Sequence, residues 1–210
     1  SIAGFKSVGM RNRFTRSVQA PTQCTSLNGS SQYWIKTSPN KLLFTDDFVV
    51  SAWVKLSSYA VGGIVGRYNG TSGFILRTTS TGKIELVGFN AGSGNYSTVV
   101  STVSLPLNKW VHITAQLDMS TFTASTTTSY VMFDGVDVPA EVSRAGSNPT
   151  ALIQAGNLEI GSYNGGTNLF NGKIAQVAIF NSKVAQSTIA GYISQGLSGS
   201  ETALDSAYSF

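Results

Sequence analysis

The chain has little charge: only 11% of its 210 residues are Asp, Glu, Lys or Arg, against about 25% in typical globular domains. Ser, Thr, Asn and Gly are abundant instead. This composition is unfavourable for exposed helices, which normally carry charged residues on their solvent faces. It favours an all-β fold.

Cysteine, histidine and long apolar runs are also scarce. Cys24 is the only cysteine, so no disulfide can form within the chain. No apolar stretch approaches the about 20 residues of a membrane-spanning helix, and we expect no membrane span. His112 is the only histidine, and neither a nucleophile-elbow motif nor a Gly-Lys-Ser/Thr phosphate loop occurs.

Basic residues concentrate at the beginning of the chain, where residues 1–45 contain six Lys and Arg and no acid. Four of them lie in the first sixteen positions: Lys6, Arg11, Arg13 and Arg16. A polar leader is usually disordered unless something holds it. We therefore weigh two interpretations of residues 1–25, a solvated tail and an assembly arm that docks on this chain or on neighbouring subunits. Nucleic acid is not an expected partner, since no aromatic repeats interleave with the basic residues.

Residues 26–194 contain many short segments with the period of two that a half-buried strand shows. In FVVSAWVKL (48–56) and WVHITAQLD (110–118), apolar residues alternate with a more mixed set that includes Trp53, Trp110 and His112. GGIVGRY, GFILRTT, KIELVGF, YSTVVSTV, NLEIGSY and FNGKIAQVAIF show the same β-branched and aromatic bias. About eleven or twelve strands predict a two-sheet β-sandwich.

Three local signals refine this prediction. Asp134-Gly135 between two apolar runs indicates a tight hairpin, because its turn needs positive φ at both central residues. Apolar residues at helical spacing predict one short helix that ends at Gly196: Ala185, Ile189, Tyr192 and Ile193. In the tail at 195–210, DSAYSF alternates as a returning strand would.

Five stretches, in this order, resemble the motifs of laminin G-like domains of the concanavalin A-like lectin and glucanase superfamily. They are LNGSSQYWIK, FVVSAWVKL, NKWVHITAQLD, YVMFDGVDV and LEIGSYNGGTNLFNGKIAQVAIFNSKVAQSTI. The resemblance covers residues 26–194 and implies a jelly-roll sandwich of two curved antiparallel sheets. Its concave face or rim loops would hold a ligand.

The resemblance also implies that His112 is a structural residue of a strand. Nucleophilic catalysis would need a Ser or Cys and an orienting carboxylate beside it, and the motifs for this are missing. Glucanases of the superfamily use two carboxylates on one face of a strand. Asp46 and Asp47 are adjacent and point to opposite faces, so Asp137 and Glu141 form the best enzymatic candidate. Pro139 between them interrupts the strand. We expect a protein that is not an enzyme.

Many family members bind calcium at the rim, where an acid often follows the sequence Gly-Lys-Ile. Here Ala175 and Gln176 follow Gly172-Lys173-Ile174. Neutral side chains cannot supply the charged oxygen ligands that set calcium affinity. We therefore predict no metal or cofactor, and calcium is a doubtful ligand.

Aromatic and amide side chains are the candidates for ligand binding. Trp53 and Trp110 would stack against sugar rings if their strands lie in the concave sheet. The alternative is that another segment of the chain covers them. Loops rich in Tyr, Asn and Gly suit polar recognition as well as tight turns. The candidate ligand-binding residues in these loops are Tyr68, Asn69, Asn90, Asn95, Tyr96, Tyr163, Asn164 and Asn168.

These observations predict a non-enzymatic binding and assembly protein on a virion or on the extracellular surface of a cell. The first interpretation is a structural part of a phage or viral particle, as decoration, fibre or baseplate, that presents a surface for glycans. The alternative is a stand-alone secreted lectin-like module. A glycan-cleaving enzyme ranks last.

Overall fold

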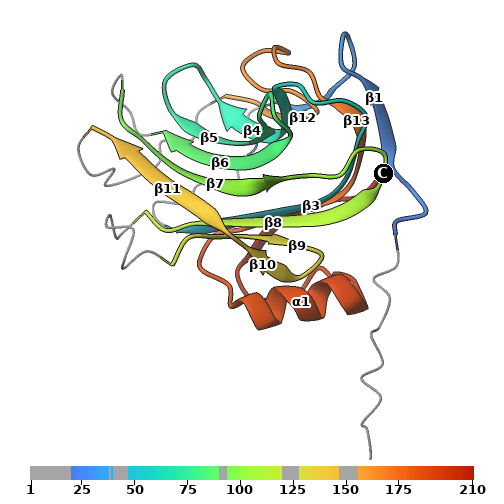
Figure 1. Cartoon of the computed structure of the whole chain (residues 1–210), viewed down its shortest axis with the longest axis vertical. Helices are drawn as coiled ribbons and strands as arrows, with labels where there is room; N and C mark the ends of the chain where they lie inside the picture. Colours follow the sequence, from blue (N-terminus) through green and yellow to red (C-terminus); the bar gives the residue numbers. More distant parts are fainter. Residues whose placement is uncertain (1–19, 38, 40–46, 90–93, 120–127, 147–155) are drawn as a thin grey trace, which may run out of the picture.

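A computed structural model describes residues 20–37, 39, 47–89, 94–119, 128–146 and 156–210. The basic residues predicted to form an assembly arm lie outside this part of the chain. Two antiparallel sheets stack face to face, and one helix lies against the outer face of the lower sheet (Figure 1). The predicted jelly-roll sandwich with one short C-terminal helix is confirmed.

Sheet A contains seven strands. In spatial order they are β1 (Thr25–Asn28), β13 (Asn171–Phe180), β3 (Phe48–Leu56), β8 (Trp110–Leu117), β9 (Tyr130–Phe133) and β10 (Val136–Val138), with β14 (Leu204–Tyr208) also pairing with β13. Sheet B contains the other seven. They are β11 (Ala140–Ala145), β7 (Tyr96–Ser104), β6 (Lys83–Phe89), β5 (Gly73–Thr78), β4 (Gly62–Tyr68), β12 (Leu158–Ile160) and β2 (Trp34–Lys36). Both sheets bend the same way, so the outer face of sheet B is concave (Figure 1).

One edge of β13 is covered by strands from the two distant ends of the described sequence. Asn171–Ile174 pair with β1, and Val177–Phe180 pair with β14. Both partners run antiparallel to β13, so β14 is followed along this edge by β1. A bulge between them places Gln176 at a φ of 49°.

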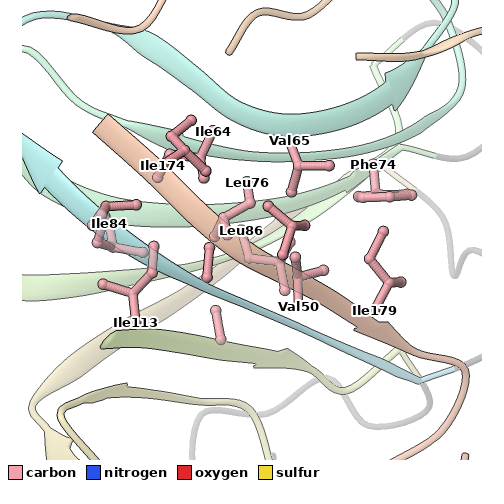
Figure 2. Close-up of a cluster of buried hydrophobic side chains, with 14 of the residues drawn as sticks. Val50, Ile64, Val65, Phe74, Leu76, Ile84, Leu86, Ile113, Ile174 and Ile179 are labelled. Carbon is pink, nitrogen blue, oxygen red and sulfur yellow. The ribbon is translucent and has the colours of Figure 1, made fainter. Parts of the chain in front are cut away.

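The main core lies between the sheets, where the alternating apolar residues of both layers meet. Figure 2 shows part of it, with Val50, Ile113 and Ile179 of sheet A opposite Phe74, Leu76 and Leu86 of sheet B. These side chains are fully buried or nearly so. Apolar residues recur with a period of two in β3, β5, β6 and β8 because one face of each strand packs into this dry interior, as expected.

A second, smaller core fixes helix α1 (Gln186–Gln195) on the outer face of sheet A. Ile189 and Val184 pack there against Val49, Met132 and Phe180. The helix has no side-chain cap, no acid in its first turn and no base in its last turn. Packing therefore stabilises it more than local signals do. The predicted helix and its end at Gly196 are confirmed.

The predicted Asp134-Gly135 hairpin is present between β9 and β10, with φ values of 52° and 77° at the turn. After Pro139 the chain leaves sheet A and enters sheet B as β11. The C-terminal strand β14 lies where the alternating tail predicted a strand. In the described part of the chain, no helix has the length and apolar character needed to cross a membrane.

Candidate functional site

Three aromatic rings form a row across one end of the outer face of sheet B. Tyr68 ends β4, Phe89 ends β6 and Tyr96 begins β7. The Tyr68 and Phe89 ring centroids are 4.5 Å apart, and those of Phe89 and Tyr96 are 6.2 Å apart. Tyr96 keeps 37% of its surface exposed, and the other two are partly exposed. We call these three residues the aromatic row.

The row is continuous because the strand in its middle contributes no side chain. Gly73 of β5 pairs with Tyr68 on one side and with Phe89 on the other. It adopts a φ of 118°, and a Cβ there would lie 1.8 Å from the carbonyl oxygen of Arg67. Only glycine fits this position, and its missing side chain lets the two neighbouring rings meet.

A loop after β12, residues 161–168, lies over the same face; we call it the rim loop. The buried carboxylate of Glu159 holds it by accepting hydrogen bonds from the Ser162 hydroxyl (2.5 Å) and from the N–H groups of Gly165 (2.7 Å) and Gly166 (3.0 Å). Three donors satisfy a charge that would be costly to bury alone. The loop position is thus fixed by one side chain of the sheet.

The rim loop places Tyr163 against β4 and beside a charged pair. Gly63 and Gly66 make room for its ring, since a Cβ at either position would meet Tyr163 atoms at 2.8 and 3.2 Å. Its hydroxyl accepts a 3.1 Å hydrogen bond from Nη1 of Arg77, whose Nε donates to Glu85 at 2.5 Å. We call Arg77, Glu85 and Tyr163 the polar cluster.

Electrostatics keep the Arg77 guanidinium charged. Burial acts to lower the pKa of Arg77, but the hydrogen bonds and the charge of Glu85 and Tyr163 outweigh it and raise the pKa. The Arg77 and Glu85 side chains remain 29% and 14% exposed. The pair therefore offers donors and acceptors of hydrogen bonds to a ligand on this face.

The residues between the row and the cluster are apolar and close-packed. Ile75 and Val87 point outward from β5 and β6 and belong to neither core, yet they are almost fully buried. Thr98 of β7 lies beside Val87, and its hydroxyl bonds with that of Ser143 at 2.8 Å. The face thus combines aromatic rings, a closed apolar floor and a polar cluster, which suits a ligand with apolar C–H faces and many hydroxyls.

The structure brings most of the predicted loop residues to this face. Tyr68, Tyr96 and Tyr163 belong to the row or the cluster. Asn69 serves the turn after β4, because its side-chain oxygen accepts bonds from the N–H groups of Thr71 (3.1 Å) and Ser72 (2.9 Å).

The other predicted amides occupy the rim loop and neighbouring turns. Asn164 and Asn168 are exposed in the rim loop, both with positive φ. The side-chain oxygen of Asn164 faces the site of Gly70 in the turn after β4. Asn95 lies against Gly146, and Asn90 is outside the described residues.

The two tryptophans lie in sheet A, so the condition for stacking, that their strands lie in the concave sheet, is not met. Trp53 of β3 is only 5% exposed. It lines a cavity of about 20 Å³ together with Tyr192 and Ile193 of α1. Trp110, partly buried, is on β8 of the same sheet. The helix makes Trp53 unavailable for stacking against a sugar, as the alternative of a covering segment had predicted.

His112 lines the same small cavity. Its ring meets that of Trp53 edge to face at 5.3 Å, and its Nδ1 lies 3.5 Å from the Thr114 hydroxyl. Burial lowers the pKa of His112 to about 3, so its ring is neutral near pH 7. The Asp134 carboxylate accepts a hydrogen bond from the backbone N–H of His112 and not from its ring. This geometry fits a packed strand residue.

The acids predicted as the best enzymatic candidate do not share a face. Asp137 is in β10 of sheet A and accepts a hydrogen bond from Gln186 of α1, whereas Glu141 is in β11 of sheet B. The chain changes sheet at Pro139, between them. The candidate pair of Asp137 and Glu141 is therefore wrong.

Asp47 is tied into a separate ion network. Lys183 Nζ lies 3.1 Å from Asp47 and 3.2 Å from Asp118, and it joins the segment before α1 to both carboxylates. Among the described residues, no three or more His, Cys, Asp or Glu side chains gather as metal ligands would. At the stretch expected to bind calcium in relatives, Ala175 is buried and Gln176 is exposed.

The sequence interpretation missed four residues of the site: Phe89, Arg77, Glu85 and Glu159. Phe89 was visible as the last aromatic of KIELVGF, two positions after Val87. Arg77 and Glu85 are directly paired in the β5–β6 register, which a hairpin prediction for GFILRTT and KIELVGF would give. Glu159 gave no signal, because its partners come from the loop that follows.

Comparison with known proteins places the chain in a family. A laminin G family model, described as concanavalin A-like lectin/glucanases superfamily, matches residues 28–190. None of the curated proteins matches the chain significantly.

Solved structures share the fold at low sequence identity. A Bacteroides ovatus protein provisionally described as carbohydrate binding is 18% identical, with a TM-score of 0.59; the match covers 90% of this chain and 52% of that one. The CBM40 module of a Ruminococcus gnavus sialidase, bound to α2,3-sialyllactose, is 11% identical, with a TM-score of 0.59 and coverages of 84% and 98%. Domain 4 of the Geobacillus stearothermophilus arabinanase AbnA, in complex with arabinotriose, is 17% identical, with a TM-score of 0.58 and coverages of 80% and 75%. From its sheet topology and the extent of the family match, the chain belongs to the concanavalin A-like lectin/glucanases superfamily.

Proposed function

We propose that this protein is a non-enzymatic glycan-binding protein and that its binding surface is the outer face of sheet B. The observation that carries the proposal is the aromatic row beside the polar cluster. Stacking of sugar C–H faces on exposed rings, with hydroxyls bonded to nearby polar groups, is a common way to bind carbohydrate. The structural relatives bound to α2,3-sialyllactose and to arabinotriose support the same function.

The test is a glycan array followed by calorimetry on the strongest hits, using residues 1–210 and single variants. We expect Tyr96→Ala and Tyr68→Ala each to weaken binding about tenfold, which corresponds to ~1.4 kcal/mol. Tyr59→Ala is the matched control. Tyr59 is an exposed tyrosine that contacts Gly82, between β5 and β6 at the opposite end of sheet B. Binding that survives both row variants would contradict the proposal.

A second part of the proposal concerns assembly. The basic segment with Lys6, Arg11, Arg13 and Arg16 suits a contact with neighbouring subunits of a larger particle, such as a virion, whereas a secreted lectin-like module would not need it. Deleting residues 1–19 separates the two, since this leaves all described strands intact. For a particle component we expect the truncated chain to remain a folded monomer and to lose assembly. For a secreted module the deletion would change neither oligomeric state nor glycan binding.

A further inference from the structure

We infer that the outer face of sheet B selects uncharged glycans over acidic ones, with Glu85 as the residue that excludes negative charge. This inference rests on the proposed glycan-binding function. It concerns the chemical class of the ligand, which the aromatic row alone leaves open.

The charged groups of this face do not favour an acidic ligand. Strand alternation, read from core neighbours such as Leu76, Ile84 and Val99, shows which side chains of sheet B point outward. In the described strands, the charged residues at outward positions are two bases and three acids: Arg77, Lys83, Glu85, Glu141 and Glu159. Glu159 is buried under the rim loop, so the remaining two bases and two acids balance, and this face lacks the positive excess that gives the whole chain its net charge of +4.

Arg77, the outward base that bonds to the rim loop, is already engaged by neighbouring groups. An arginine that captures a carboxylate usually presents two parallel N–H groups and an uncompensated charge. Here Nε is already bonded to Glu85 at 2.5 Å and Nη1 to Tyr163 at 3.1 Å. An incoming sialate or uronate would meet the Glu85 carboxylate at the same place, and like charges that approach in a partly dry site repel.

The paired side chains of Arg77 and Glu85 suit the neutral hydroxyls of a sugar. The guanidinium has N–H groups beyond the two that these bonds use, and the second carboxylate oxygen of Glu85 is an acceptor. Side by side they can donate to one hydroxyl and accept from its neighbour. This recognition needs no net charge on the ligand.

The experiment uses residues 1–210 and pairs of probes in which the acidic member carries one or more carboxylates that the uncharged member lacks. Lactose is compared with α2,3-sialyllactose, and trigalactose with trigalacturonic acid. We expect the uncharged member of each bound pair to bind about tenfold better. Stronger binding of the acidic members would overturn the inference but leave glycan binding intact. A failure to bind any glycan, or binding insensitive to Tyr96→Ala, would overturn the proposed function instead.

Two substitutions should move the selectivity in opposite directions. Glu85→Gln keeps a hydrogen-bonding partner for Arg77 but removes the repelling charge. We expect it to shift the neutral-to-acidic affinity ratio about fivefold toward the acidic probe at low salt, and less at high salt. Arg77→Gln leaves Glu85 uncompensated and should shift the ratio the other way. Because the readout is a ratio, a general loss of affinity in either variant does not obscure it.

Asp137→Asn is the matched control. It removes the same charge from sheet A, on the far side of the sandwich, and should leave the ratio unchanged. An unchanged ratio in Glu85→Gln, or an equal shift in Asp137→Asn, would show that Glu85 does not set the selectivity.

Discussion

Arg77 and Tyr163 lie 86 positions apart in the sequence, and a 3.1 Å hydrogen bond from Nη1 of Arg77 to the Tyr163 hydroxyl joins sheet B to the rim loop. The guanidinium also lies 5.8 Å from the centroid of the Tyr163 ring. A hydroxyl that reaches the guanidinium restricts it to one orientation beside Glu85. The orientation of the charged pair therefore depends on a loop that follows a different strand.

Tyr163→Phe tests this dependence with the smallest possible change. The ring still fills the space over Gly63 and Gly66, but the bond to Arg77 is lost. We expect about 1 kcal/mol lower stability in urea unfolding and severalfold weaker binding of the best uncharged glycan. Tyr59→Phe is a matched control for binding: it also removes a tyrosine hydroxyl bond, the 2.8 Å bond to the Leu105 carbonyl oxygen, and should lose similar stability without losing glycan affinity. If Tyr163→Phe binds as tightly as the unaltered chain, the hydroxyl does not position the cluster.

Glu159→Gln should loosen the rim loop. An amide keeps an acceptor oxygen at only one of the two carboxylate positions. Its NH₂ group therefore faces either the N–H of Gly165 or the N–H of Gly166 and the Ser162 hydroxyl. We expect a stability loss of about 1–3 kcal/mol and faster hydrogen exchange at the amides of Gly165 and Gly166. Glu141→Gln, an exposed acid of the same sheet, should stay within about 0.5 kcal/mol. Unchanged exchange at both glycines would show that Glu159 does not hold the loop.

His112 should make the protein less stable as the pH falls. The folded state keeps His112 neutral, with a pKa of about 3, whereas the unfolded chain protonates it near its ordinary value of 6.5. Between these values the unfolded state binds more protons, so this contribution to stability is present above pH 6.5 and is lost on acidification. From pH 7 to pH 5 we expect urea unfolding of the unaltered chain to lose about 2 kcal/mol more than that of His112→Gln. Parallel pH profiles for the two proteins would contradict this assignment.

Gly73→Ala should disrupt both the fold and the aromatic row. Its Cβ would collide with the Arg67 carbonyl oxygen at a φ that alanine avoids, so we expect a loss of about 3 kcal/mol or more. Gly94→Ala is the control, because Gly94 also has positive φ but nothing lies within 4 Å of its Cβ position. That variant should lose about 1 kcal/mol. Equal losses would mean that backbone strain alone, without the collision, explains the requirement for glycine.

We expect bound glycans to be recovered intact after prolonged incubation, as chromatography or mass spectrometry would show. Glu85 and Glu141 flank Val100 on the same face. Among the described acids that point outward from sheet B, they are the pair that a hydrolytic mechanism would use, since glycosidases need two carboxyl groups at the scissile bond. Glu85 is instead engaged by Arg77. Cleavage products that disappear in the double variant Glu85→Gln/Glu141→Gln would identify an enzyme.

The alternation in β3 and β8 was sufficient to predict strands, but it could not show what covers each face. Trp53 and His112 are on the faces with mixed polarity, which for an exposed sheet would be solvent-facing. Helix α1, more than 60 positions away from either, packs over that face and buries both. Such a long-range contact leaves no periodic signal in the strand itself.

Those residues of the candidate site that lie in local turns could be predicted from the sequence. Those that reach the site through the pairing register of neighbouring strands were much harder to predict. Tyr68, Tyr96 and Tyr163 were found because they stand next to Asn and Gly in loops. Phe89 belongs with them only because β5 and β6 pair so that Gly73 lies opposite it. The Glu159 carboxylate depends on how a loop folds back over its own strand.

The edge of sheet A has a consequence for how the chain reaches its native state. β14 and β1 complete one edge end to end, but the β13–β14 pairs join residues only 24–31 positions apart. The β1–β13 pairs, which finish the edge, join residues 143–149 positions apart. Loop-closure entropy makes such pairings late events in folding. The same collinearity makes the protein a good candidate for circular permutation, since a linker from β14 to β1 would join two segments that already follow one another along β13.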